Sequence, residues 1–143
     1  MNIFVLCLVS AMMLFTSCSE RDPKQVVIDV LQYAKDGEKE KILNMIDREH
    51  WGGDYMPDGS CLGVEETVDK LLLATKDRDI LGKENVKIYN EFDEYITLTY
   101  EDNSFVNGRN FDILVYLYKR KNGYIIHGMT VSRGNPIHLP QRN

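Results

Sequence analysis

Residues 111–131 have the sequence FDILVYLYKRKNGYIIHGMTV, two runs rich in β-branched and aromatic residues on either side of Asn122-Gly123. Asn-Gly favours a type I′ turn, because both central residues of that turn need positive φ, and this turn joins adjacent strands into a hairpin. We therefore expect a strand from Phe111 to Lys121 and a return strand from Tyr124 to Ser132, with Asn122-Gly123 as the whole loop.

The predicted hairpin has one aliphatic face and one face of large amphipathic side chains. In this register Tyr118 lies opposite His127, and Tyr116 lies opposite Met129. The aliphatic face contains Phe111, Ile113, Val115, Leu117 and Ile126, and the other face contains Asp112, Leu114, Tyr116, Tyr118, His127 and Met129. We expect the aliphatic face to pack against helices and the second face to contact a partner or a second copy of the chain. The alternative is that the protein's own loops and tail cover the second face.

The chain before the hairpin predicts helices first and strands afterwards. Asp22 can cap a helix, Pro23 suits its first position, and Gly37 can end it in a left-handed conformation. The apolar spacing predicts helices at 23–37, 38–48 and 64–76, a loop at 51–63, and strands at 86–90 and 95–100. This order predicts a single α+β domain over residues 23–143, with N-terminal helices packed on a curved antiparallel sheet of about four strands.

This order of elements, together with the phrase Tyr33-Ala-Lys-Asp-Gly-Glu38, resembles the nuclear-transport-factor-2-like, or cystatin-like, fold. The resemblance covers about residues 22–132. It implies a curved sheet that wraps a long helix and leaves a cone-shaped pocket. It leaves the activity open, because this fold hosts isomerases, dehydratases, transport factors and binding modules.

The N-terminus has the pattern of an exported lipoprotein. Residues 3–15 are almost wholly apolar, which is typical of a secretory signal peptide and short for a membrane span of about 20 residues. The run ends in Thr16-Ser17-Cys18, which resembles the lipobox of bacterial lipoproteins. The resemblance implies that residues 1–17 are removed, that Cys18 carries a lipid, and that residues 18–22 form a short tether.

Such an anchor implies a place in the cell envelope, at the outer membrane, facing either the periplasm or the surface. The acidic tether that begins Ser19-Glu20 resembles the surface-export signal of lipoproteins of the Bacteroides group. A simple solvated linker is the alternative interpretation of the same residues.

Composition excludes some partners. The net charge is −5 and the pI is near 5.2, so the charge gives no electrostatic case for nucleic acid, which calls for a basic patch. Once Cys7 leaves with the leader and Cys18 takes the lipid, Cys61 stands alone, so we expect no disulfide. A lone cysteine is more often a small buried hydrophobe than a nucleophile.

The search for catalytic groups finds weak candidates. Asp112 and His127 share a face, but in the predicted register they lie roughly 20 Å apart, too far for proton transfer. Trp51, on the glycine-rich loop, either lines a ligand site or closes the open end of the core. Asp54 and Asp58 lack the spacing of a calcium loop, so we expect neither metal nor cofactor.

The sequence therefore favours a non-enzymatic, membrane-anchored binding module. We expect it to bind a small molecule or an envelope protein through Trp51, Tyr116, Tyr118, His127 and Met129. The first alternative is a small enzyme of the isomerase, cyclase or hydrolase type, with His127 as a candidate catalytic group. The second is an inhibitor or immunity-type protein.

Overall fold

A computed structural model describes residues 21–52, 54–55, 61–106 and 109–131. Residues 1–20, which include Cys7 and Cys18, lie outside these ranges, as do Asp58 and the residues from Ser132 onward. The helices are α2 (Pro23–Lys35), α3 (Lys39–Leu43) and α4 (Val64–Thr75), with a short 3₁₀ helix at Lys83–Asn85. The strands are β1 (Asp54–Tyr55), β2 (Cys61–Leu62), β3 (Val86–Glu91), β4 (Tyr95–Val106), β5 (Arg109–Arg120) and β6 (Gly123–Val131).

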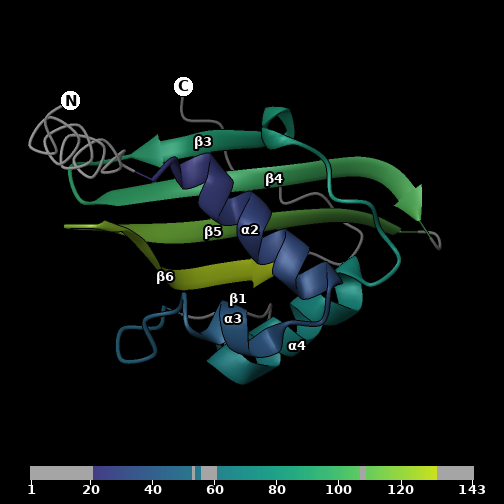
Figure 1. Ribbon diagram of the computed structural model, residues 1–143, viewed down its shortest axis with the longest axis horizontal. Coiled ribbons are helices and arrows are strands. Elements are labelled where there is room, and N and C mark those ends of the chain that lie inside the picture. Colours follow the sequence, from purple (N-terminus) through teal and green to yellow (C-terminus); the bar gives the residue numbers. More distant parts are fainter. Residues whose placement is uncertain (1–20, 53, 56–60, 107–108, 132–143) are drawn as a thin grey trace, which may run out of the picture.

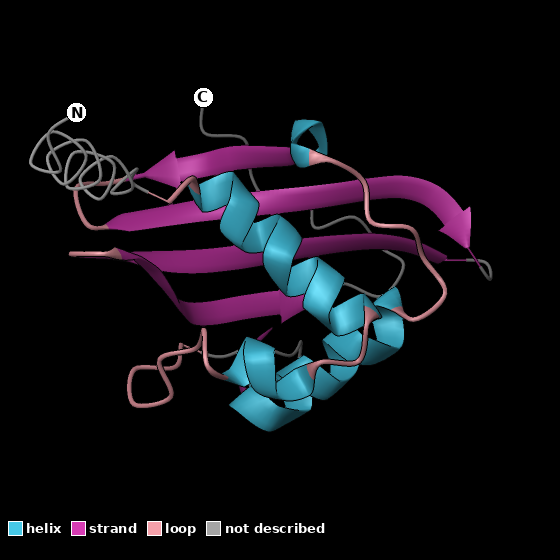
Figure 2. Ribbon diagram, viewed as in Figure 1, coloured by secondary structure: helices cyan, strands magenta, loops and turns pink. Residues whose placement is uncertain are grey.

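The main sheet is antiparallel, with the strand order β3-β4-β5-β6, and β1 pairs with β2 in a separate small hairpin. Helix α2 lies across one face of the sheet, while α3 and α4 pack beside it on the β6 side (Figures 1 and 2). Helices that cover one face of a curved four-stranded antiparallel sheet confirm the predicted α+β class.

Helix α2 begins and ends where its local sequence predicts. The Asp22 side chain accepts a hydrogen bond from the backbone N–H of Lys24 at 3.0 Å, and Gly37 has φ = +73° just after the helix. Its apolar face is buried against the sheet and α4, through Val26, Val27, Val30, Leu31 and Ala34. Burial of this face stabilises the helix more than propensity does, as is usual for a helix of this length.

The second helix is much shorter than the predicted 38–48. Helix α3 ends at Leu43, and Ile46 then forms a parallel β-bridge with Ile126. The backbone N–H groups there bond to β6 rather than continuing the helix: Asp47 N–H donates to Ile126 O at 2.8 Å, and Ile126 N–H donates to Met45 O at 2.9 Å. Pairing with the open edge of β6 therefore ends the helix early.

The β5–β6 hairpin forms, but its register differs from the prediction. Arg120 pairs with Gly123, which has φ = +134°, so the turn residues are Lys121-Asn122 and Tyr118 faces Ile125. A register shift then follows between Tyr116 and Leu117, where β6 contains one extra residue. That residue is His127, because Leu117 pairs with Ile126 and Tyr116 pairs with Gly128.

This bulge moves Met129 to the other face of the sheet. Beyond an inserted residue the alternation of side chains reverses relative to the partner strand. Met129 therefore pairs with Val115 and is fully buried in the core, instead of lying beside Tyr116 as predicted. The space between sheet and helices is filled by large apolar side chains, including Tyr100, Phe111, Leu31, Leu71 and Met129.

Candidate functional site

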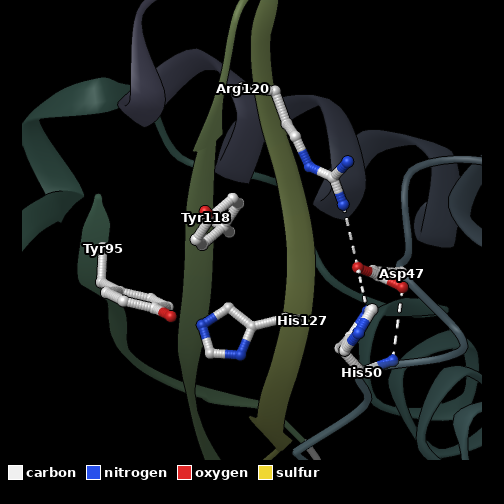
Figure 3. A pocket seen from close by; sticks show the side chains of 6 residues that line it. All are labelled: Asp47, His50, Tyr95, Tyr118, Arg120 and His127. Carbon is white, nitrogen blue, oxygen red and sulfur yellow. Dashed lines mark hydrogen bonds and ion pairs between the residues drawn. The ribbon is translucent and has the colours of Figure 1, made fainter.

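A pocket of about 470 Å³ lies on the sheet face opposite α2. It is lined by Asp47, His50, Tyr95, Tyr118, Arg120 and His127. Figure 3 looks onto this face, with the strands in front of the helices and His127 between the two tyrosines on one side and the Asp47–His50 pair on the other. The pocket thus joins residues from three strands and from the segment that follows α3.

The aromatic wall is set by cross-strand pairing. Tyr95 on β4 lies directly opposite Tyr118 on β5, and their rings meet edge-to-face with centroids 5.1 Å apart. The His127 ring lies 5.6 Å from that of Tyr95 and 5.9 Å from that of Tyr116. The bulge at His127 is what turns the imidazole into this group, because an extra residue re-aims its side chain.

The opposite wall comes from the segment that runs along the edge of β6. Gly52 N–H donates to His127 O at 2.6 Å, which fixes the end of this segment beside the bulge. Within it, Oδ1 of Asp47 accepts hydrogen bonds from the backbone N–H groups of Glu49 and His50, at 3.2 and 3.3 Å. This is the local turn that Asp side chains favour, and it places His50 over the pocket.

The charges of the site are paired with each other. Oδ2 of Asp47 lies 3.0 Å from Nδ1 of His50 and 3.0 Å from Nη2 of Arg120. Desolvation acts to raise the pKa of the Asp47 carboxyl, but the hydrogen bonds from His50 and the charges of His50 and Arg120 outweigh it, and the pKa is lowered. Asp47 therefore stays ionised and offsets the charge of Arg120.

Among the described residues, His127 and Tyr95 keep polar atoms available in the aromatic wall, whereas the hydroxyl of Tyr118 is already bonded. Burial lowers the pKa of His127, against a small opposing effect of Asp47, so the imidazole is neutral at neutral pH. Neither its ring nitrogens nor the hydroxyl of Tyr95 forms a hydrogen bond with another described residue. The hydroxyl of Tyr118 donates to Glu94 at 3.3 Å, and the negative charge of Glu94 raises the pKa of that phenol.

The structure brings together some of the residues that were predicted to bind a ligand or a partner. Tyr118 and His127 line the pocket, and Tyr116 contacts His127 beside it. Trp51 packs against the core instead, and its indole N–H donates to Leu62 O at 3.0 Å, so it anchors the small hairpin. Met129 is in the core, and Cys18 lies outside the described residues.

Sequence reasoning did not select four of the lining residues, Asp47, His50, Tyr95 and Arg120. Asp47 falls in the stretch predicted as helix and His50 lies just after it, and the Asp-x-x-His spacing was the available signal for their pairing. Tyr95 and Arg120 lie at strand ends, where only the true register shows that they converge with His127.

Two other residues that the sequence offered as chemical groups, Asp112 and Cys61, lie outside the pocket lining. Asp112 pairs with Glu101 on β4, away from His127, and burial raises its pKa, with Glu101 and Asp102 adding to the effect. Cys61 is exposed rather than buried, because it lies on the two-residue strand β2.

Within the described ranges, no group of three or more His, Cys, Asp or Glu side chains is placed to hold a metal ion. In the same part of the chain, no helix has the length and apolarity needed to cross a membrane.

Comparison with known proteins supports the fold. No protein-family profile matches the chain, and no curated protein matches it. Among solved structures, a designed NTF2-like protein titled Rd1NTF2_05, in a substituted form, matches with a TM-score of 0.51. It is 16% identical, and the match covers 76% of this chain and 95% of the designed one. The chain therefore has an NTF2-like α+β fold.

Proposed function

We propose that this protein is a membrane-anchored envelope lipoprotein whose domain binds a small molecule, without catalysis, in the pocket on the outer face of the sheet. The observation that supports binding is the pocket itself, where two tyrosine rings, and polar atoms of Tyr95 and His127 that bond to no other described residue, converge on about 470 Å³. Concave sites lined by aromatic groups and a few convergent polar groups are typical of small-molecule binding.

The described residues that line the pocket include no hydroxyl or thiol nucleophile of the serine, threonine or cysteine type, which favours binding over hydrolysis. None of the six lining residues is a serine, threonine or cysteine. The carboxylate of Asp47 is already shared between His50 and Arg120, which restrains it from acting as a free base.

The experiment on binding is native mass spectrometry of the processed, membrane-anchored protein, extracted gently from membranes. We expect an additional mass of small-molecule size that is lost in Tyr118→Ala and retained in Tyr89→Ala. Tyr89 is a matched control, because it is an exposed tyrosine on β3 that does not line the pocket. A bare protein that also binds nothing in a metabolite extract would contradict the proposal and direct attention to a protein partner.

The experiment on the anchor is fractionation of cells that express Cys18→Ala. We expect the protein to leave the membrane fraction or to keep its leader, while Cys61→Ala, an exposed cysteine of the domain, changes neither. Unchanged membrane retention and an unchanged mature N-terminus in Cys18→Ala would exclude lipidation at that residue.

A second candidate function is acid–base catalysis, favoured by the 3.0 Å contact between Asp47 Oδ2 and His50 Nδ1 at the rim of the pocket. A carboxylate that orients a histidine in this way can make it a general base. Incubation of the bound molecule with fresh protein separates the two functions. Recovery of an unchanged molecule supports a binding module, and conversion that stops in His50→Gln supports an enzyme.

A further inference from the structure

The ligand class follows from the balance of charge in the pocket. Of the six lining residues, Arg120 and Asp47 carry permanent charges, and they are paired at 3.0 Å. An anionic ligand at Arg120 would lie beside the Asp47 carboxylate and be repelled by it, and a cationic ligand at Asp47 would be repelled by Arg120. The site therefore favours a ligand without net charge, because burial of an unpaired charge is costly.

The free hydrogen-bonding atoms point to hydroxyl groups. A neutral imidazole offers one N–H donor and one nitrogen acceptor, and a phenol both donates and accepts. His127 and Tyr95 supply these groups side by side, with ring centroids 5.6 Å apart and no hydrogen-bond partner among the described residues. A hydroxyl on the ligand also donates and accepts, so several adjacent hydroxyls would satisfy both residues at once.

The aromatic wall adds an apolar component. The Tyr95 side chain is 46% exposed and is held edge-to-face against Tyr118, so part of its ring is free to cover a ligand. Aromatic rings that carry a polar group suit ligands with one apolar and one polar side. A sugar ring has this character, with a face of C–H groups and a rim of hydroxyls.

We propose that the pocket binds an uncharged saccharide, whose ring packs on Tyr95 and whose hydroxyls bond to His127, Tyr95 and the outer N–H groups of Arg120. This inference rests on the proposed binding function and adds the class of ligand. The site extends from Tyr95 to His50 across β5 and β6, so it holds more than a single contact point for an extended ligand.

The test is saturation-transfer NMR with full-length protein in detergent. The probes are neutral sugars (glucose, maltose, cellobiose, lactose and diacetylchitobiose), with glucuronate and glucosamine as the charged counterparts of glucose. We expect at least one neutral sugar to bind, and each charged sugar to bind more weakly than glucose. Tyr95→Ala should weaken binding about tenfold, since this fold-change corresponds to about 1.4 kcal/mol, which is within the range for loss of one aromatic contact. Tyr89→Ala, equally exposed but outside the pocket, should leave the affinity unchanged.

Other outcomes separate this inference from the proposed function. If native mass spectrometry finds a charged or wholly apolar ligand and no neutral sugar binds, the saccharide inference is wrong and the binding function stands. If sugars bind equally well to Tyr95→Ala and His127→Phe, the contacts lie elsewhere and the assignment to this pocket is wrong. If neither sugars nor any extracted molecule binds, both proposals fail.

Discussion

Asp47 and Arg120 lie 73 residues apart in the chain, and Nη2 of Arg120 donates a hydrogen bond to Oδ2 of Asp47 at 3.0 Å. The contact joins the end of β5 to the segment that follows α3 and closes one side of the pocket (Figure 3). The Asp47 side chain is mostly covered whereas that of Arg120 is half exposed. A partly exposed ion pair contributes little stability, so its main effect is to fix the geometry of the pocket wall.

Asp47→Ala should loosen the turn that carries His50. The variant removes the acceptor for the backbone N–H groups of Glu49 and His50, as well as the partner of Arg120. We expect faster amide hydrogen exchange at residues 49 and 50, with global stability changed little. Asp79→Ala is the control, because Asp79 also holds an exposed ion pair, with Lys35, far along the chain. Equal exchange at residues 49 and 50 in both variants would contradict this role.

Gly128→Ala should destabilise the fold through Tyr116. A Cβ at position 128 would lie 2.9 Å from Cδ2 of Tyr116, closer than real Cβ contacts, so the ring or the bulged strand has to move. We expect a loss of about 1–3 kcal/mol in the free energy of unfolding, measured by chemical denaturation. In a Tyr116→Ala background the same substitution should cost much less. An equal cost in both backgrounds would mean that the clash is with something other than this ring.

The buried pair of Arg78 and Asp102 should respond strongly to the loss of one partner. Nη1 of Arg78 lies 3.4 Å from Oδ2 of Asp102 and also donates to Ser104 O at 3.2 Å, and both charged side chains are over nine-tenths buried. Arg78→Met leaves a buried carboxylate uncompensated, so we expect a loss of about 3–5 kcal/mol in the free energy of unfolding.

A second substitution tests the cause of that loss. Asp102→Asn removes the charge but keeps an acceptor for the backbone N–H of Ser104, which bonds to Asp102 Oδ1 at 2.8 Å. The double variant Arg78→Met, Asp102→Asn should therefore recover much of the lost stability. Arg48→Met is the exposed control, since its ion pair with Glu65 is half exposed on both sides, and it should change stability by less than about 1 kcal/mol. No recovery in the double variant would assign the loss to packing against Phe111.

His127 should make the protein less stable in mild acid. Burial lowers the pKa of its imidazole below the ordinary value of 6.5, so the unfolded chain takes up this proton more readily than the folded state. Its contribution to stability is therefore complete above pH 6.5 and falls as the pH drops through 6.5 toward the lowered pKa of the folded state. In His127→Phe this loss should disappear, which denaturation curves between pH 8 and 5 can measure. An identical pH dependence in both proteins would show that His127 does not titrate with unfolding.

Local sequence predicted most elements well. The cap at Asp22 and the positive φ at Gly37 bound α2, and strands form at the predicted β3, β4, β5 and β6 positions. These features depend on residues a few positions apart, so they can be inferred without the rest of the chain. The register of the β5–β6 hairpin was harder to predict from the sequence, because a turn at Lys121-Asn122 and one at Asn122-Gly123 satisfy nearly the same local preferences.

The class of fold and the aliphatic face of the hairpin can be inferred from local sequence, because hydrophobic periodicity and turn residues act over short distances. The pocket, in contrast, arises only when distant segments pack together. Its formation requires the segment after α3 to add to the edge of β6 and β6 to bulge at His127, which brings Asp47 and His50 to Tyr95, Tyr118 and Arg120. Such contacts between distant segments depend on how whole elements pack, and no local pattern along the chain specifies that packing.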